Sequence, residues 1–134
     1  MSAVSELADR YRAAADFRVA LLGFQRRTTS ITARHGLTPQ RYLLLLLIRV
    51  RSDAGEPATV TTLREPLQMT QSAVTQLVIG AEAAGLVRRM PDPGDARSHA
   101  LALTPEGAQR LRRAFEALSE ERGNLLRRVE ALGR

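Results

Sequence analysis

Apolar residues recur at helical spacing along most of this chain, and polar, turn-forming segments separate the helices that they predict. Residues 3–34 contain no proline, and two apolar series spaced by seven run along them: Leu7, Ala14, Leu21 and Phe17, Phe24, Ile31. This stripe predicts one long helix, about 45 Å in length, that ends near Gly36. A helix of that length exceeds what so small a domain covers by itself. The stripe therefore indicates a partner helix from a second copy, with packing inside the monomer as the alternative.

The middle of the chain predicts a buried helix followed by a shorter, less regular one. Thr38 and Pro39 are typical of a helix start, and residues 40–51 are apolar almost all round, which predicts a core helix. Residues 58–60 are expected to form a very short strand. Thr61 or Thr62 is expected to cap the next helix, where Thr62 and Glu65 have the spacing of a capping box. Pro66 requires this helix to be short or bent.

The second half of the chain predicts a helix, a hairpin and a last long helix. Thr70 caps a helix that ends at Gly85, and residues 86–90 and 99–103 alternate as two strands around a polar loop at 91–98. Thr104-Pro105 starts a helix that is expected to run to about Arg122, where Gly123 and Asn124 interrupt it. The order helix, turn, capped helix, strand, polar hairpin, strand is that of a winged helix-turn-helix. The predicted fold class is mainly α with a small β-hairpin wing.

Composition narrows the classes of function. The chain has 134 residues, which is the size of one domain, and a formal net charge of +6 in which every basic residue is arginine. This basic balance favours nucleic acid or another anionic surface as a partner. The absence of cysteine excludes disulfides and thiolate chemistry, and two distant histidines offer little to a metal site, so we expect no catalytic residues, metal or cofactor. No apolar run is long enough for a membrane helix and no secretory signal is evident, so a cytoplasmic protein is expected.

The helix after Thr70 has one apolar and one polar face. At 100° per residue, its apolar side chains fall on one face and are expected to pack inward: Val74, Leu77, Val78 and Ala81. The opposite face carries Ser72, Thr75, Gln76 and Ile79, with Gln71 beside it. Hydroxyl and amide groups suit base edges in a major groove, although a solvated polar face is the simpler interpretation of this helix taken alone. The helix N-terminus also directs backbone N–H groups toward phosphate.

The polar loop between the strands is expected to act as a wing. Gly94 and the neighbouring prolines set its turn, and Arg97 stands near the tip, where a guanidinium can enter a narrow minor groove. Asp95 can pair with Arg97 and hold it in position. Arg88 and Arg89 begin the hairpin, and one of them is expected to point outward toward phosphate.

Three segments together resemble the MarR family of winged-helix regulators: residues 36–49, 60–89 and 92–107. The most specific part is Asp-Pro-x-Asp-x-Arg at 92–97, followed by a strand and Leu-Thr-Pro-Glu-Gly at 103–107. The resemblance implies an obligate homodimer, with residues 37–104 as the DNA-binding lobe and residues 1–36 and 105–134 as dimerisation helices. It also implies a transcription regulator, most often a repressor, on a pseudo-palindromic site in double-stranded DNA. The DNA-contacting residues that we expect are Thr70, Gln71, Ser72, Thr75, Gln76, Arg88, Asp95 and Arg97.

The chain departs from the family pattern at three places. The position of Gln76 is commonly basic in the family, and Ile79-Gly80 replaces what is usually a charged pair. An exposed Ile79 would be able to contact a thymine methyl group, whereas a buried Ile79 would pack against a neighbouring side chain. Inside a helix, a glycine such as Gly80 lowers helix stability by about 1 kcal/mol relative to alanine. Pro66 is unusual in the supporting helix.

Many family members release DNA when a small aromatic anion binds between the dimer helices and the lobe. The aromatic candidates for such a pocket are Tyr11, Phe17, Phe24 and Tyr42, with Arg18 or Arg41 nearby in sequence. The alternative is that these aromatic residues, which have helical spacing, pack in the hydrophobic core. An alternative function is a winged-helix adaptor that pairs with another regulator and has no operator of its own. An enzyme has little support, since no nucleophile–base pair or phosphate-binding loop is present.

Overall fold

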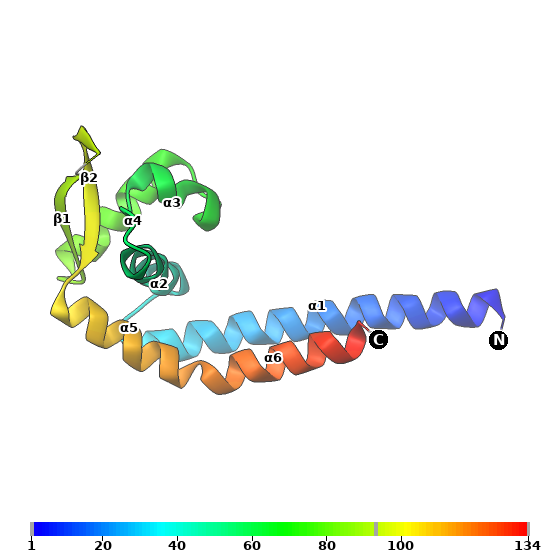
Figure 1. Cartoon of the computed structure of the whole chain (residues 1–134). Coiled ribbons are helices and arrows are strands. Elements are labelled where there is room, and N and C mark those ends of the chain that lie inside the picture. The colour runs from blue at the N-terminus through cyan, green and yellow to red at the C-terminus, as the bar shows by residue number, and fades with distance from the viewer. Residues whose placement is uncertain (1, 93, 134) are drawn as a thin grey trace.

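The chain folds into a compact lobe from which a long helical rod extends (Figure 1). The computed structural model describes residues 2–92 and 94–133. The order of elements is α1 (Ala3–Arg34), α2 (Pro39–Asp53), α3 (Val60–Leu67), α4 (Gln71–Ala83), β1 (Val87–Asp92), β2 (Asp95–Leu103), α5 (Pro105–Ala117) and α6 (Ser119–Leu132). This is the mainly helical winged-helix fold, with one two-stranded hairpin, that the sequence predicts. None of the described helices is long and apolar enough to cross a membrane.

Threonine side chains start most of the helices in the lobe. Thr38 and Thr70 accept the backbone N–H groups of Arg41 and Ala73, each at 3.1 Å, as expected. For α3 the prediction is wrong: Thr59, rather than Thr61 or Thr62, is the N-cap, and Thr62 completes its capping box. With Pro66 in its last turn, α3 is only eight residues long.

The expected strand at 58–60 is absent, because Thr59 already caps α3 and Val60 begins that helix. Only one backbone hydrogen bond joins this segment to the wing in the described part of the chain: the N–H of Leu101 donates to the carbonyl of Ala58 at 2.7 Å. One bond is too little for a strand ladder.

The core of the lobe lies where α2, α3, α4 and the hairpin meet. Its fully buried large side chains are Leu44, Leu45, Ile48, Leu63, Val74, Val78 and Leu86. The helix α2 is not buried all round as expected, since Leu43 and Val50 remain 37% and 57% exposed.

The junction between β2 and α5 explains the Leu-Thr-Pro-Glu-Gly motif. The hydroxyl of Thr104 donates to the carbonyl of Gly85 at 2.5 Å and accepts the N–H of Gly107 at 3.0 Å. A Cβ atom on Gly107 would lie only 2.0 Å from the carbonyl oxygen of Leu86. Gly107 therefore lets the first turn of α5 rest directly on the chain that enters β1.

The C-terminal segment bends earlier than expected. Helix α5 ends at Ala117, buried Leu118 forms the junction, and α6 runs through Gly123 and Asn124 without a break. The bend lets α5 pack on α2 while α6 packs on α1 (Figure 1). Arg27 and Glu121 form an ion pair across the α1–α6 contact. Tertiary packing therefore places the break, and the glycine at position 123 does not.

Helix α1 carries apolar side chains on two faces. The second half of the predicted stripe, Leu21, Phe24 and Ile31, is half-buried inside the monomer, while Leu7 and Phe17 are 43% and 41% exposed. A second stripe lies on the side of the helix away from α6, by 100° per residue. It consists of Val4, Ala8, Tyr11, Ala15 and Leu22.

Candidate nucleic-acid interface

Helix α4 presents an exposed polar face, as its sequence predicts. Val74, Val78 and Ala81 are buried in the core, and Leu77 packs beside them. Ser72 and Gln76 are exposed, Thr75 is half-buried, and Ile79 is 45% exposed. Gln71 is exposed in the first turn, next to the capping hydroxyl of Thr70. One amphipathic helix therefore places these candidate residues along a single open surface.

The N-terminus of α4 is free of acidic side chains. No carboxylate in the first turn therefore neutralises its first N–H groups or the positive end of its dipole. The N–H of Ala73 is bonded to the hydroxyl of Thr70. This is the arrangement in which a helix start accepts a phosphate oxygen.

Gly80 has a packing partner that the sequence did not reveal. The guanidinium of Arg41, from α2, lies against it: a Cβ atom on Gly80 would be 2.7 Å from Nη2 of Arg41. Gly80 thus lets Arg41 lie on the flank of α4, beside the polar face.

The wing is longer than expected, and its strand pairing shifts register between Pro91 and Asp92. The strands β1 and β2 extend into the segment predicted as loop, and residues 87–91 pair with 99–103 in antiparallel register. Asp92 pairs with Asp95 at the tip, so the loop at 91–98 was predicted too long. The turn role expected of Pro93 lies outside the described residues. At the tip, the carboxylate of Asp92 accepts the N–H of Gly94 at 2.9 Å.

Asp95 supports the wing tip differently from the prediction. Its carboxylate accepts the backbone N–H of Arg97 at 2.9 Å, and the described residues show no ion pair between the two side chains. The guanidinium of Arg97 is exposed and stays available to a partner.

The two arginines at the start of the wing have different environments. Arg89 bonds to Glu82 of α4 at 2.8 Å, which ties the hairpin to the helix. Arg88 lies one strand position earlier, on the other face of β1, and is exposed. Both residues are exposed, and Arg88 is the one of the pair that forms no ion pair among the described residues.

Sequence reasoning missed part of this surface at the turn between α3 and α4. Arg64 and Gln68 border an open hollow there together with Thr70. Gln68 adopts a left-handed conformation, with φ of 53°, and its side chain is exposed. The sequence signal for both residues was their position a few residues before Thr70, the N-cap of α4.

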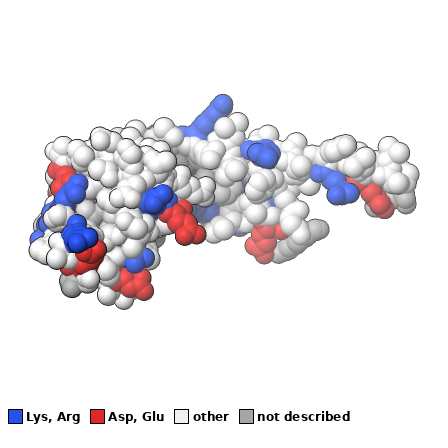
Figure 2. Space-filling model, turned by 90° about the horizontal axis from the view of Figure 1, so that it is seen from above, with Lys and Arg blue, Asp and Glu red and all other residues white. Residues whose placement is uncertain are grey.

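Charged side chains lie both on the helical rod and on the lobe (Figure 2). Figure 2 shows arginine and acidic side chains near its edges and a broad area without charge between them. The elements that pack beside α4 carry exposed or half-buried cations: Arg41 on α2, Arg64 on α3, and Arg88 and Arg97 on the wing.

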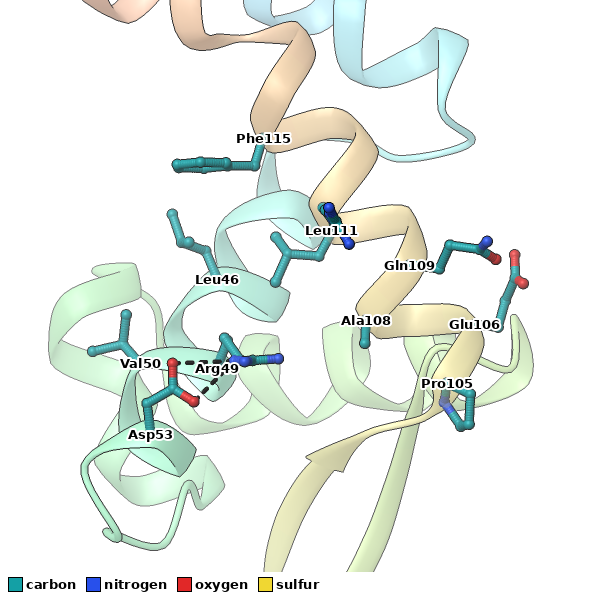
Figure 3. Close-up of a pocket in the computed structure, with 11 residues that line it drawn as sticks. Leu46, Arg49, Val50, Asp53, Pro105, Glu106, Ala108, Gln109, Leu111 and Phe115 are labelled. Atoms are coloured by element: carbon teal, nitrogen blue, oxygen red, sulfur yellow. Dashed lines mark hydrogen bonds and ion pairs between the residues drawn. The ribbon is translucent and has the colours of Figure 1, made fainter.

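The aromatic residues proposed for a ligand pocket do not come together. Tyr11 is 68% exposed on the projecting part of α1, while Tyr42 is buried at the start of α2. A different hollow, of about 940 Å³, lies between α2 and α5 (Figure 3). Apolar Leu46, Val50, Leu111 and Phe115 line it together with the cations Arg49 and Arg112. Sequence reasoning missed it because it forms only when α5 packs on α2.

Comparison with known proteins finds a matching family model and solved structures with the same fold. Residues 35–98 match the model of the MarR family. A protein described as a putative transcriptional regulatory protein for the hcr operon of Thauera aromatica is 28% identical over 104 residues, which cover 78% of this chain. The chain spans 60% of the length of that curated relative.

Solved structures share the arrangement over most of the chain. A crystal structure of a MarR family transcription regulator is 25% identical, with a TM-score of 0.76, and the match covers 96% of this chain and 80% of that one. A mutant of Escherichia coli MarR complexed with operator DNA is 19% identical, with a TM-score of 0.69, covering 93% and 85%. The regulator MOSR of M. tuberculosis in complex with DNA is 21% identical, with a TM-score of 0.65, covering 81% and 75%.

Proposed function

We propose that this chain is a homodimeric, sequence-specific DNA-binding regulator of the MarR family, most simply a repressor, because residues 35–98 match the model of that family and its members are transcription regulators rather than enzymes. The observation that carries the proposal is the surface formed by α4 and the wing. The exposed polar face of α4 suits base edges, while the outward arginines of its neighbours suit phosphates. We assign residues 37–104 to the DNA-binding lobe, and residues 1–36 and 105–134 to dimerisation.

In this proposal the contacts divide by chemistry. Gln71, Ser72, Thr75 and Gln76 enter the major groove, and the N-terminus of α4 at Thr70 faces a phosphate. Arg97 enters the adjacent minor groove, with Asp95 shaping the tip that presents it. Arg88 faces the DNA backbone. The similarity in fold to two proteins solved with DNA supports this placement.

Dimerisation is proposed from the projecting part of α1. Residues 3–19 are exposed except for half-buried Ala13, and this part of α1 extends away from the lobe (Figure 1). Isolated helices of this length are marginal in water, and this one exposes Val4, Tyr11 and Val19 by 79%, 68% and 62%. A second copy that covers the stripe on the outer side of α1 would bury Val4 and Tyr11.

A footprint on DNA from upstream of its own gene tests the proposal. A two-fold dimer predicts two protected half-sites with centres about 10 base pairs apart, or a multiple of that distance. Protection of a single half-site would contradict the dimer. Absence of any protected region, with specific capture of another regulator, would favour the adaptor function instead.

The hollow between α2 and α5 is the site that we propose for a small aromatic effector. Its volume is in the range of ligand sites, its apolar side chains suit a ring, and Arg49 and Arg112 suit a carboxylate (Figure 3). Arg49 is bonded to Asp53 at 2.9 Å and Arg112 to Glu116 at 3.3 Å, so a ligand would compete for both cations.

Benzoate is a suitable probe of this site. We expect benzoate to weaken DNA binding by the wild type and to have little effect on Val50→Trp, because an indole at this exposed position would fill the hollow. Isothermal calorimetry with benzoate and anisotropy with DNA would measure the two effects. Equal responses of both proteins would contradict the assignment.

A further inference from the structure

The surface of α4 that faces away from the core carries no cation. The only charged side chain of α4 is Glu82, and Arg89 of the wing pairs with it at 2.8 Å. Arginine and lysine are the usual partners of guanine in the major groove, where they bond to O6 and N7. The helix therefore lacks the side chains that most often specify a G·C pair.

Ile79 is the apolar residue on this surface. By 100° per residue it follows Ser72 and Gln76 along one line of the helix, and it is 45% exposed. This exposure leaves part of the Ile79 side chain open to a partner, as contact with a thymine methyl group requires. Gly80 beside it leaves one flank open to Arg41 and adds no side chain that would shield Ile79.

We propose that Ile79 is a specificity-determining residue that contacts the C5 methyl group of a thymine, so that each half-site has an A·T pair at this position. The inference rests on the proposed DNA-binding function. Thymine alone presents a methyl group in the major groove, and apolar contact with it is a recognised form of readout. Burying the two aliphatic groups against each other removes apolar surface from water.

The position of this thymine relative to the other contacts follows from helix geometry. Ile79 lies seven residues after Ser72, which is about 10.5 Å along the helix axis. With a rise of about 3.4 Å per base pair along the duplex axis, the two residues face positions at most about three base pairs apart.

Selection from a randomised duplex library with the wild-type protein, followed by substitution of single thymines by deoxyuracil, tests the inference. Deoxyuracil removes only the methyl group and keeps the base pair. We expect an invariant A·T pair whose deoxyuracil form binds about four-fold more weakly, the equivalent of about 0.8 kcal/mol for one buried aliphatic group. Other thymines in the half-site serve as the internal control.

Two variants connect the effect to Ile79. Ile79→Ala is expected to bind the thymine and deoxyuracil duplexes equally, whereas Ile79→Val, which keeps a branched side chain, retains a preference for thymine. Circular dichroism checks that both variants are folded.

The outcomes distinguish failure of the Ile79 inference from failure of the proposed DNA-binding function. A selected site whose binding is indifferent to every thymine methyl, or an Ile79→Ala protein with the wild-type preference, overturns the inference and leaves DNA binding intact. Failure of the wild type to enrich any sequence overturns the proposed function and the inference with it.

Discussion

Single residues decide where backbone segments of this molecule can touch, and Gly107 is the clearest case. A Cβ atom there would collide with the carbonyl oxygen of Leu86, and neither backbone can move without disturbing the capped start of α5. Gly123 also lies within a helix, but a Cβ atom there would meet only the flexible end of Arg127, at 3.2 Å.

We therefore expect opposite effects of the same substitution at two helical glycines. Gly107→Ala should lower the free energy of unfolding by about 1–3 kcal/mol, since the clash outweighs the gain in helix propensity. Gly123→Ala should raise it by up to about 1 kcal/mol. Urea denaturation of both variants measures the difference, and stabilisation by Gly107→Ala would refute the close approach.

Tyr42 makes the free energy of unfolding depend on pH. Burial raises the pKa of Tyr42 above its ordinary value of 10.0, and the positive charge of Arg122 partly opposes this rise. The folded state therefore holds the phenolic proton more tightly than the unfolded state. The stabilisation is complete below pH 10 and is lost as the pH rises through 10 toward the higher pKa of the folded state.

We expect the stability of the wild type to fall between pH 9 and pH 11, with a smaller fall for Tyr42→Phe. The chain contains no lysine or cysteine and only two tyrosines, so few other side chains titrate in this range. Urea denaturation at a series of pH values gives the comparison. Identical profiles of the two proteins would show that Tyr42 is not responsible.

At the scale of elements, the sequence predicted the helices whose limits depend on local chemistry. Thr38, Thr70 and Gly85 each directly flank an apolar pattern, and the structure confirms all three. The start of α3 was misplaced because Thr59, Thr61 and Thr62 all have capping side chains. Only packing of Leu63 and Leu67 in the core selects among them.

The remaining errors have a tertiary cause. The bend at Leu118 and the hollow between α2 and α5 depend on how α5 and α6 divide their contacts between the lobe and α1. The exposed polar face of α4 was predictable from its period alone, whereas Arg64 and Arg41 join the surface only through the packing of α2 and α3 beside it.

The two faces of α1 allow a test of dimerisation. We expect the double substitution of Tyr11 and Leu22 by Asp to weaken self-association by about 100-fold or more, because it replaces two apolar side chains of the outer stripe with charges. Ser30→Asp, on an exposed polar position of the same helix, is the control. Sedimentation velocity over a concentration series measures both, and wild-type association of the double variant would assign the dimer to another surface.

At the scale of the whole molecule, the proposed function separates affinity from specificity: the net charge is +6, outward arginines lie on the elements beside α4, and α4 itself carries no cation. In this proposal the arginines contact phosphates, and such contacts depend on salt and not on sequence. The amide, hydroxyl and aliphatic side chains of α4 are proposed to contact bases.

The most direct test of this account is fluorescence anisotropy with DNA from upstream of the gene and with unrelated DNA, over a series of salt concentrations. The account predicts tight binding to the upstream DNA, weak binding to the control, and affinity that falls steeply with salt. Arg97→Ala should weaken binding and reduce the log–log salt slope by about 1, while Arg113→Ala, an exposed arginine of α5, should leave both unchanged. Equal, weak binding of the wild type to both DNAs would contradict sequence-specific DNA binding.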